Sequence, residues 1–353
     1  MNILVYGAGV LGSLYGYRLQ QAGHEVTFLA RGQRLADLLD RGLELQDLVT
    51  GERLSAPARV IDHLEPGGAY DLALVIMGYN KIPGVLPALQ ANTAIPTVLF
   101  MGNNAAGPGE LVRALGPDRV MMGFPLASGT IRDGVVHFAA ELNGRHSRAV
   151  IGEIDGAVTP RAEEIAGVLA SAGFDVEISP DIDAWLKSHA AVILPLAGMF
   201  YGAENDALRL ARTRDALVLG VRAVREGIDV LQARGYPVLP SRTEAAFRMV
   251  PEPLLVLFLS RLLLRPEMQY ALVHAEHSRE ELRELAVHFM VLAAPTRLPT
   301  PALDCICSLL DPSKPPLPDG SRTLSLHWRR TAGFALALAG LIAGLFLVRQ
   351  GKK

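Results

Sequence analysis

A glycine-rich turn near the amino terminus restricts the fold of this chain more than any other feature. Asn2 to Tyr6 is a short apolar run typical of a buried parallel strand, and it leads directly into Gly7-Ala8-Gly9-Val10-Leu11-Gly12. A helical pattern from Ser13 to Ala22 and a second strand-like run from Glu25 to Ala30 complete a strand–helix–strand unit. In this context the glycines predict a dinucleotide-binding turn, with the backbone of these six residues facing a pyrophosphate at the helix amino terminus.

The residues after the second strand indicate which dinucleotide binds. An NAD site usually places Asp or Glu there to bind the ribose 2′-hydroxyl. This chain reads Ala30-Arg31-Gly32-Gln33-Arg34 and has no acid. Because a guanidinium can pair with a 2′-phosphate, we expect NADP(H), bound by Arg31 with help from Arg34. The alternative is that Arg31 is a solvated surface arginine.

Strand and helix patterns alternate through the first half of the chain. Buried strands are expected at Leu72 to Met77 and Thr97 to Met101, and helices at Ile82 to Gln90 and Gly109 to Leu115. The alternation predicts an α/β fold, a Rossmann-type doubly wound parallel sheet over residues 1–180. Two hairpin-like stretches, 42–61 and 129–140, are expected to add to that sheet.

The second half has a different pattern. Helical segments are expected at 184–201, 208–234, 253–264 and 271–292, which predicts an all-helical substrate or dimerisation domain over residues 181–311. Four prolines between 312 and 318 mark a linker over residues 312–330. A homodimer is compatible with this organisation.

The carboxyl-terminal end carries an apolar segment, TAGFALALAGLIAGLFLV, at residues 331–348. These eighteen uncharged residues are flanked by basic residues on both sides, and as a helix they would span about 27 Å. We expect a transmembrane tail anchor that holds the protein on the cytoplasmic face of a membrane. A buried terminal helix, or an apolar arm exchanged between subunits, is the alternative.

Composition excludes other classes. The chain has 34 basic and 36 acidic residues, so no global basic field points to nucleic acid. The only cysteines, Cys305 and Cys307, are too few for a disulfide framework or a zinc site. We therefore expect reduced thiols, no metal and no nucleic-acid partner.

Together, several motifs resemble the ketopantoate reductase (2-dehydropantoate 2-reductase) family. They are the glycine turn at the extreme amino terminus, Arg31 after VTFLA, Asn103 in FMGNNAAG, Trp185-Leu186-Lys187, and Leu298-Pro299-Thr300-Pro301 before the last helical segment. The resemblance covers roughly residues 1 to 311 and rests on the order and spacing of these motifs.

The resemblance implies that NADPH reduces the ketone of a 2-keto acid. It assigns Lys187 as the proton donor, Glu281 as its orienting partner and Asn103 as the residue beside the nicotinamide and the substrate. A lysine beside a carboxylate can be held charged for proton donation. Taken singly, Lys187 and Glu281 could be solvated helix residues, and Asn103 a loop cap.

The chain departs from the family pattern at three positions. Met77, Ala191 and Gln269 stand where the family has a lysine, an asparagine and a serine that bind the substrate. His189, His274 and His277 are alternative polar groups near these positions, but a structural role is favoured for them. The sequence thus predicts an NADPH-dependent reductase of a small carbonyl substrate. A membrane-tethered NADP(H)-binding protein without catalysis and a true ketopantoate reductase are the alternatives.

Overall fold

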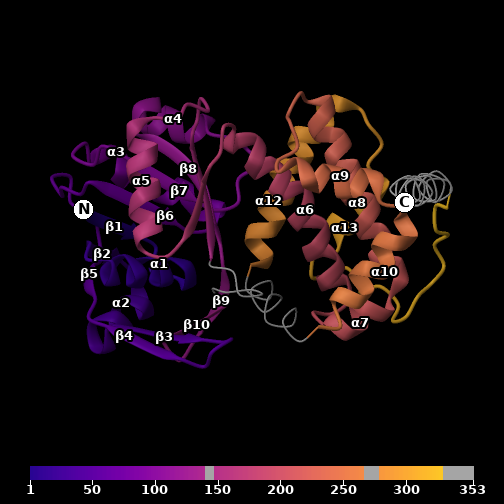
Figure 1. Ribbon diagram of the computed structural model, residues 1–353, viewed down its shortest axis with the longest axis horizontal. Coiled ribbons are helices and arrows are strands. Elements are labelled where there is room, and N and C mark those ends of the chain that lie inside the picture. Colours follow the sequence, from indigo (N-terminus) through magenta and orange to yellow (C-terminus); the bar gives the residue numbers. More distant parts are fainter. Residues whose placement is uncertain (140–146, 266–277, 329–353) are drawn as a thin grey trace, which may run out of the picture. The chain divides into compact units, whose positions relative to one another are not determined.

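The computed structural model describes residues 1–139, 147–265 and 278–328 (Figure 1). The chain forms two compact units: unit 1 comprises Met1–Ala190 and Gln269–Leu292, and unit 2 comprises Ala191–Met268 and Ala293–Lys353. The expected boundary near residue 181 falls just before helix α6 (Ile182–Gly202), which begins in unit 1 and ends in unit 2. Most of helix α12 (Arg279–Ala293) groups with unit 1, although the sequence placed it in the second domain.

The main sheet of unit 1 has eight strands in the order β12-β11-β8-β7-β6-β1-β2-β5. Neighbouring strands run parallel except β11 and β8, which are antiparallel. The strands are β1 (Asn2–Tyr6), β2 (Glu25–Leu29), β5 (Arg59–Ile61), β6 (Leu72–Ile76), β7 (Val98–Met101), β8 (Val120–Leu126), β11 (Arg148–Glu153) and β12 (Asp175–Ile178). The predicted α/β Rossmann-type sheet is therefore confirmed, and it ends with three strands, β8, β11 and β12, that the sequence pattern did not reveal.

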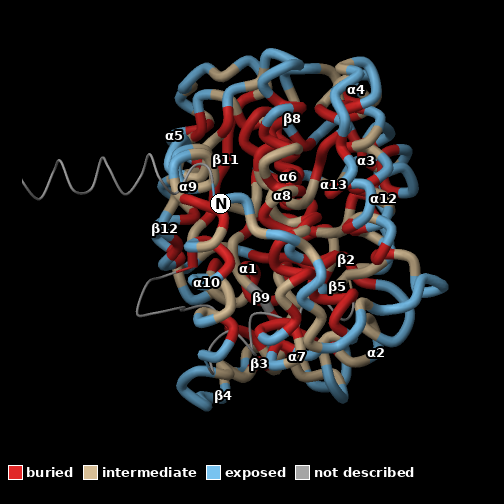
Figure 2. The backbone as a smooth tube through the Cα atoms, turned by 90° about the vertical axis from the view of Figure 1, so that its right-hand side faces the viewer, coloured by how far each residue is buried: buried red, intermediate tan, exposed pale blue. Residues whose placement is uncertain are grey.

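Helices and short 3-10 turns connect these strands. They are α1 (Val10–Gln21), α2 (Gly32–Arg41), η1 (Tyr79–Gly84), α3 (Leu86–Ala91), α4 (Gly109–Leu115), η2 (Pro117–Arg119) and α5 (Pro160–Ser171). The central strands β6 and β7 are buried along their whole length. In Figure 2 the buried residues, drawn in red, lie in the interior, and the exposed ones, drawn in pale blue, lie mostly in peripheral segments. Burial on both faces explains why the sequence has continuous apolar runs there instead of alternation. Because β1, β6 and β7 are parallel neighbours, their carboxyl ends lie side by side at one edge of the sheet.

The two hairpin-like stretches form a second sheet. Its order is β4-β3-β10-β9, from β3 (Leu43–Asp47), β4 (Arg53–Ala56), β9 (Ser128–Arg132) and β10 (Val135–Ala139). Only β5 joins the main sheet, so the expectation that both hairpins extend that sheet is wrong. The reason is the pairing of β10 with β3, which joins strands about ninety residues apart and leaves no local trace in the sequence.

Unit 2 is helical, as predicted. Beyond the carboxyl-terminal part of α6, its described elements are α7 (Ala207–Arg212), α8 (Arg214–Ala233), α9 (Ser241–Met249), α10 (Glu252–Leu262), η4 (Ala294–Thr296) and α13 (Pro301–Ser308). The single helix expected over 208–234 is broken at Thr213, whose hydroxyl donates a hydrogen bond to the Arg209 carbonyl, 2.8 Å away. Cys305 and Cys307 are free thiols on α13.

The proline-rich segment after α13 is attached to unit 2 by hydrogen bonds. The buried Asp215 carboxylate accepts bonds from the Thr323 and Leu324 amides at 2.8 and 3.0 Å, and Arg212 makes a two-bond ion pair with Asp319 at 2.7 Å. The segment predicted as a linker is thus held along α7 and α8 over much of its length.

No helix within the described parts of the chain is both long and apolar enough to cross a membrane. The apolar tail at residues 331–348 lies outside the described residues.

Candidate active site

The turn after β1 accepts only glycine at two positions. Gly7 has a φ of +111°, and a Cβ atom on it would lie 2.6 Å from the carbonyl oxygen of Ile76. A Cβ atom on Gly12 would lie 1.9 Å from the carbonyl oxygen of Gly7. At Gly9 the φ is –73°, and no neighbouring atom lies within 4 Å of the position that a Cβ would take. The turn is therefore closed tightly at its ends and open at its middle glycine.

Helix α1 begins at this open position. Gly9 is its N-cap residue and no side chain caps the helix, so the first-turn amides at Val10 and Leu11 have no side-chain acceptor there. The amino terminus of a helix carries partial positive charge and exposed N–H groups, which suit an anion. The uncapped helix start and the open position at Gly9 are therefore suited to an anion such as a pyrophosphate.

Arg31 lies just after β2, as the sequence predicted, and immediately before α2, a helix that the sequence pattern did not reveal. Its exposed guanidinium contacts the Tyr6 hydroxyl and the Asp62 carbonyl at 3.4 Å each. Both distances exceed the usual range of 2.7–3.2 Å, so these contacts hold the side chain weakly. Burial raises the pKa of Tyr6, and the nearby Arg31 cation partly opposes that rise. The position suits a group that turns to meet a phosphate.

Arg34 has a different environment from the one expected. Its guanidinium donates hydrogen bonds to the Ala8 carbonyl at 2.9 Å, to Ser13 Oγ at 2.9 Å and to the Gly134 carbonyl at 2.7 Å. Burial lowers the pKa of this guanidinium. The described contacts of Arg34 thus point at the glycine turn, whereas the sequence interpretation placed it beside Arg31 at the 2′-phosphate.

Asn103 and Glu281 are 178 residues apart in sequence and form a hydrogen bond. Asn103 follows β7, and its Nδ2 donates to Glu281 Oε1 on α12 at 2.7 Å. A Cβ atom on Gly78, just after β6, would lie 2.8 Å from Glu281 Oε2. Asn103 Oδ1 is buried and has no hydrogen-bond partner in the described structure. The pair therefore occupies the sheet edge where β6 and β7 end, with one acceptor available to a donor group from a ligand.

Lys187 lies on α6 with its side chain 3 % exposed, and it forms an ion pair with Asp183 one turn earlier. Its Nζ is also close to Gly107, where a Cβ atom would lie 3.3 Å away. Asn104 holds Gly107 in place by bonds of 2.9 and 3.1 Å between its side-chain amide and the Gly107 backbone. The loop after β7 therefore has Asn103 with Glu281 at one end and Lys187 at the other.

The ion pair described for Lys187 differs from the predicted one. The sequence interpretation paired Lys187 with Glu281, whereas the structure pairs Lys187 with Asp183 and Glu281 with Asn103. Asp183 was missed, although its spacing of four residues from Lys187 on a helix is a recognised signal for an ion pair.

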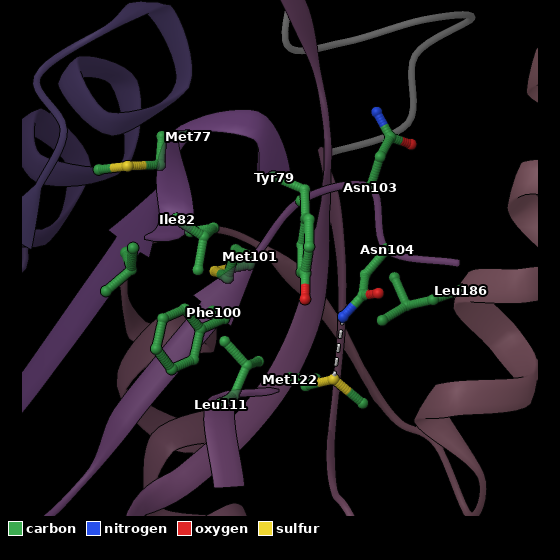
Figure 3. Close-up of a pocket in the computed structure, with 12 residues that line it drawn as sticks. Met77, Tyr79, Ile82, Phe100, Met101, Asn103, Asn104, Leu111, Met122 and Leu186 are labelled. Atoms are coloured by element: carbon green, nitrogen blue, oxygen red, sulfur yellow. Dashed lines mark hydrogen bonds between the residues drawn. The ribbon is translucent and has the colours of Figure 1, made fainter. Parts of the chain in front are cut away.

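A small apolar hollow lies next to this loop (Figure 3). It is lined mainly by side chains from β6, β7, η1 and neighbouring elements, including Tyr79, Ile82, Phe100, Leu111 and Leu186. Asn104 points into it and makes a weak contact with the Met122 sulfur at 3.7 Å, while Asn103 points away from it. We interpret the hollow as packing beneath the loop and not as the position of the reacting atoms.

Two of the three positions that depart from the family pattern, Met77 and Ala191, have apolar surroundings in the structure. Met77 packs beside the glycine turn, with its Cε 3.3 Å from the position of a Cβ on Gly7. Ala191 is buried against Gly227 in unit 2. Gln269 lies outside the described residues, together with His274 and His277.

His189 is held by aromatic rings. Its ring lies 4.1 Å from that of Phe124 and is stacked on Trp185 at 5.5 Å, with an angle of 8° between the planes. Burial lowers the pKa of His189 to about 4, so the imidazole is neutral at pH 7. It cannot bind an anion by charge at that pH, and the structural interpretation of this residue is favoured. Among the described residues, no cluster of His, Cys, Asp or Glu could hold a metal ion.

Comparison with known proteins agrees with this geometry. Residues 3–156 match the family model described as ketopantoate reductase PanE/ApbA. A 2-dehydropantoate 2-reductase of Archaeoglobus fulgidus is 28% identical over 240 residues, which are 67% of this chain and 75% of that protein. The 2-dehydropantoate 2-reductase of Pyrococcus horikoshii is 26% identical over 240 residues, which again are 67% of this chain and 75% of that protein.

Solved structures share the fold. The 2-dehydropantoate 2-reductase of Geobacter metallireducens superposes with a TM-score of 0.71 at 20% identity, covering 88% of this chain and 99% of that one. A ternary structure of D-mandelate dehydrogenase with NADH and anilino(oxo)acetate gives a TM-score of 0.71 at 16% identity, covering 88% and 97%. Residues 3–156 are thus similar to the ketopantoate reductase family PanE/ApbA, and solved 2-dehydropantoate 2-reductases share the fold of the chain.

Proposed function

We propose that the chain is an NADPH-dependent reductase that converts the ketone of a 2-keto acid into a 2-hydroxy acid. The observation that carries this proposal is the Asn103–Glu281 hydrogen bond at the sheet edge beside the glycine turn. It brings two polar groups from distant parts of the chain to the edge where ligands bind in open α/β sheets. The match of residues 3–156 to the ketopantoate reductase model and the similarity to 2-dehydropantoate 2-reductases support the same reaction class.

Residues of unit 1 would hold the cofactor. The backbone of Gly7, Ala8, Gly9, Val10, Leu11 and Gly12 receives the pyrophosphate, because the turn is open at Gly9 and leads into an uncapped helix. Arg31 binds the 2′-phosphate, and the unpartnered Oδ1 of Asn103 accepts a hydrogen bond from the nicotinamide carboxamide or from substrate. When bound, NADPH supplies the hydride.

The remaining chemistry is a proton transfer. We assign Lys187 as the general acid that protonates the ketone oxygen as it becomes a hydroxyl group. Asp183 fixes the direction of the Lys187 ammonium through the ion pair, the task that the sequence interpretation gave to Glu281. Glu281 holds Asn103 through their hydrogen bond, and it can accept a further hydrogen bond from a substrate that carries a hydroxyl group. Residues 181–311, in this proposal, supply the substrate-binding part of the protein.

The reaction is tested by NADPH oxidation at 340 nm with a panel of 2-keto acids. The panel includes ketopantoate, which is polar, and aromatic and aliphatic 2-keto acids without a hydroxyl group. We expect turnover of at least one of them. A folded, NADPH-binding protein that reduces none would favour the alternative of a nucleotide-binding protein without catalysis.

The position of Arg31 predicts that this residue determines the preference for NADPH over NADH. Replacing it with alanine should raise the Kd for NADPH by roughly 10- to 100-fold, because a charge-assisted contact to the 2′-phosphate is lost. The Kd for NADH, which lacks that phosphate, should change much less. Titration calorimetry with both nucleotides measures the two effects, and equal losses would remove Arg31 from the 2′-phosphate site.

We also propose that residues 331–348 anchor the protein to the cytoplasmic face of a membrane. The support is their uncharged length, and the spacing of Gly340 and Gly344 would allow two such helices to pair in a homodimer. Flotation of the full chain with lipid vesicles tests the anchor. A double replacement of Leu341 and Leu345 by arginine should abolish flotation, since each charge in the bilayer centre costs about 2.5–3.5 kcal/mol. Flotation that survives this change would contradict the proposal.

A further inference from the structure

We propose that Arg34 is a positioning residue that orients the phosphate-binding face of the glycine turn. This inference rests on the proposed function, and it assigns to Arg34 a task separate from recognition of the 2′-phosphate. The evidence is that the Arg34 guanidinium forms hydrogen bonds with three separate segments of the chain.

Arg34 lies in the first turn of α2, and each of its described hydrogen bonds reaches a different segment of unit 1. Nε donates to the Ala8 carbonyl within the glycine turn, Nη2 to Ser13 on α1, and Nη1 to the Gly134 carbonyl between β9 and β10. The fully buried Ser13 Oγ donates in turn to the same Ala8 carbonyl at 3.1 Å. The Ala8 oxygen is therefore held by two donors.

Fixing this oxygen determines where the next amide points. In a planar trans peptide the carbonyl oxygen of Ala8 and the N–H of Gly9 lie on opposite sides of the unit. When Arg34 and Ser13 draw the oxygen inward, the Gly9 N–H must point the other way. A Cβ placed on Gly9 would have no atom within 4 Å, so there is free space beside this residue in which a pyrophosphate can meet the N–H group.

The second sheet completes the support. Gly129 of β9 lies against the first residue of α1, because a Cβ there would be 2.7 Å from Val10 Cγ1. Gly134, which accepts the third Arg34 bond, has a φ of +80° and closes the turn between β9 and β10. Arg34 thus connects the glycine turn to a sheet that already packs against the start of α1. This gives the second sheet a role in cofactor binding through Arg34.

A pyrophosphate-orienting role predicts equal effects on two nucleotides. Replacing Arg34 with alanine should raise the Kd of the full chain for both NADPH and NADH by about tenfold, since loss of one charge-assisted hydrogen bond is worth roughly one order of magnitude. Arg34→Lys should leave most of this loss in place, because an ammonium has no planar fork to reach three acceptors. Titration calorimetry gives both constants, and thermal unfolding without nucleotide shows whether each variant is folded.

Arg41 provides a matched control on the same helix. It donates to the Asp133 carbonyl of the same β9–β10 turn at 3.0 Å, and its described contacts do not reach the glycine turn. Arg41→Ala should therefore leave both dissociation constants unchanged. If Arg34→Ala does not fold, Ser13→Ala removes the second donor to the Ala8 oxygen and should weaken both nucleotides several-fold.

Each other outcome overturns the inference. If Arg34→Ala weakens the binding of NADPH but not of NADH, Arg34 is a ligand of the 2′-phosphate. If Arg34→Lys has wild-type dissociation constants, Arg34 contributes only its positive charge. A folded Arg34→Ala protein with unchanged affinities would leave it a purely structural residue while the proposed function stands. A wild-type chain that binds neither nucleotide would remove the proposed function and this inference together.

Discussion

Replacing Lys187 with alanine should lower kcat on any 2-keto acid that the protein reduces by about 10²- to 10⁴-fold, the range for loss of a general acid. The Kd for NADPH should stay within about threefold of the wild-type value, because the described contacts of Lys187 do not include the glycine turn or Arg31. Stopped-flow measurement of NADPH oxidation under single-turnover conditions separates the chemical step from product release.

The control for this prediction is Asp183→Asn. It removes the charge of the partner and keeps the ammonium, so kcat should fall by about tenfold or less and the Kd for NADPH should remain unchanged. Lys187→Ala instead leaves Asp183 without its partner, and thermal unfolding is needed to show that the variant is folded. A folded Lys187→Ala enzyme with wild-type kcat would assign the proton transfer to another group.

The parts of the site that could be predicted from sequence depend on local geometry. Gly7 and Gly12 are required because a Cβ on either would collide with backbone within a few residues or on the adjacent strand. Arg31 follows because the end of β2 has a fixed relation to the first turn in this fold. The role of such positions can therefore be predicted from a short sequence motif.

The parts that could not be predicted depend on long-range contacts. Arg34 bonds to residues 26, 21 and 100 positions away, and only the folded chain shows that these three acceptors meet. The second sheet was missed for the same reason, since β3 pairs with the distant β10. Asn103 and Glu281 were each found through a family resemblance, but their mutual hydrogen bond follows from the packing of α12 in unit 1.

The break between α7 and α8 shows the limit of periodicity. The apolar pattern runs through Thr213 without interruption, yet the backbone there has a ψ of +84° and leaves the helix. The Thr213 hydroxyl caps the Arg209 carbonyl and accepts a bond from the Gly320 amide at 3.1 Å. A residue from the proline-rich segment thus stabilises the break, and no local pattern could indicate its approach.

Replacing Gly9 with alanine should weaken binding of both NADPH and NADH by roughly 10- to 100-fold without destabilising the free protein. The backbone of Gly9 has a φ of –73° that alanine adopts without strain, and no atom lies within 4 Å of the new methyl group. The methyl group would occupy the space that the pyrophosphate needs for its close approach to the helix. The thermal midpoint without nucleotide should therefore stay unchanged, while its rise on addition of NADPH should shrink.

Gly12→Ala is the matched comparison, because the same methyl group meets a different environment. At Gly12 it would lie 1.9 Å from the Gly7 carbonyl oxygen, so α1 must move away from β1 before any nucleotide binds. We expect this variant to lose about 1–3 kcal/mol of stability in the free state. One substitution then reports on the space for the ligand and the other on the closure of the turn. A Gly9→Ala protein with wild-type affinity for both nucleotides would show that the pyrophosphate does not cross α1 at this residue, and the assignment of the cofactor site would have to be abandoned.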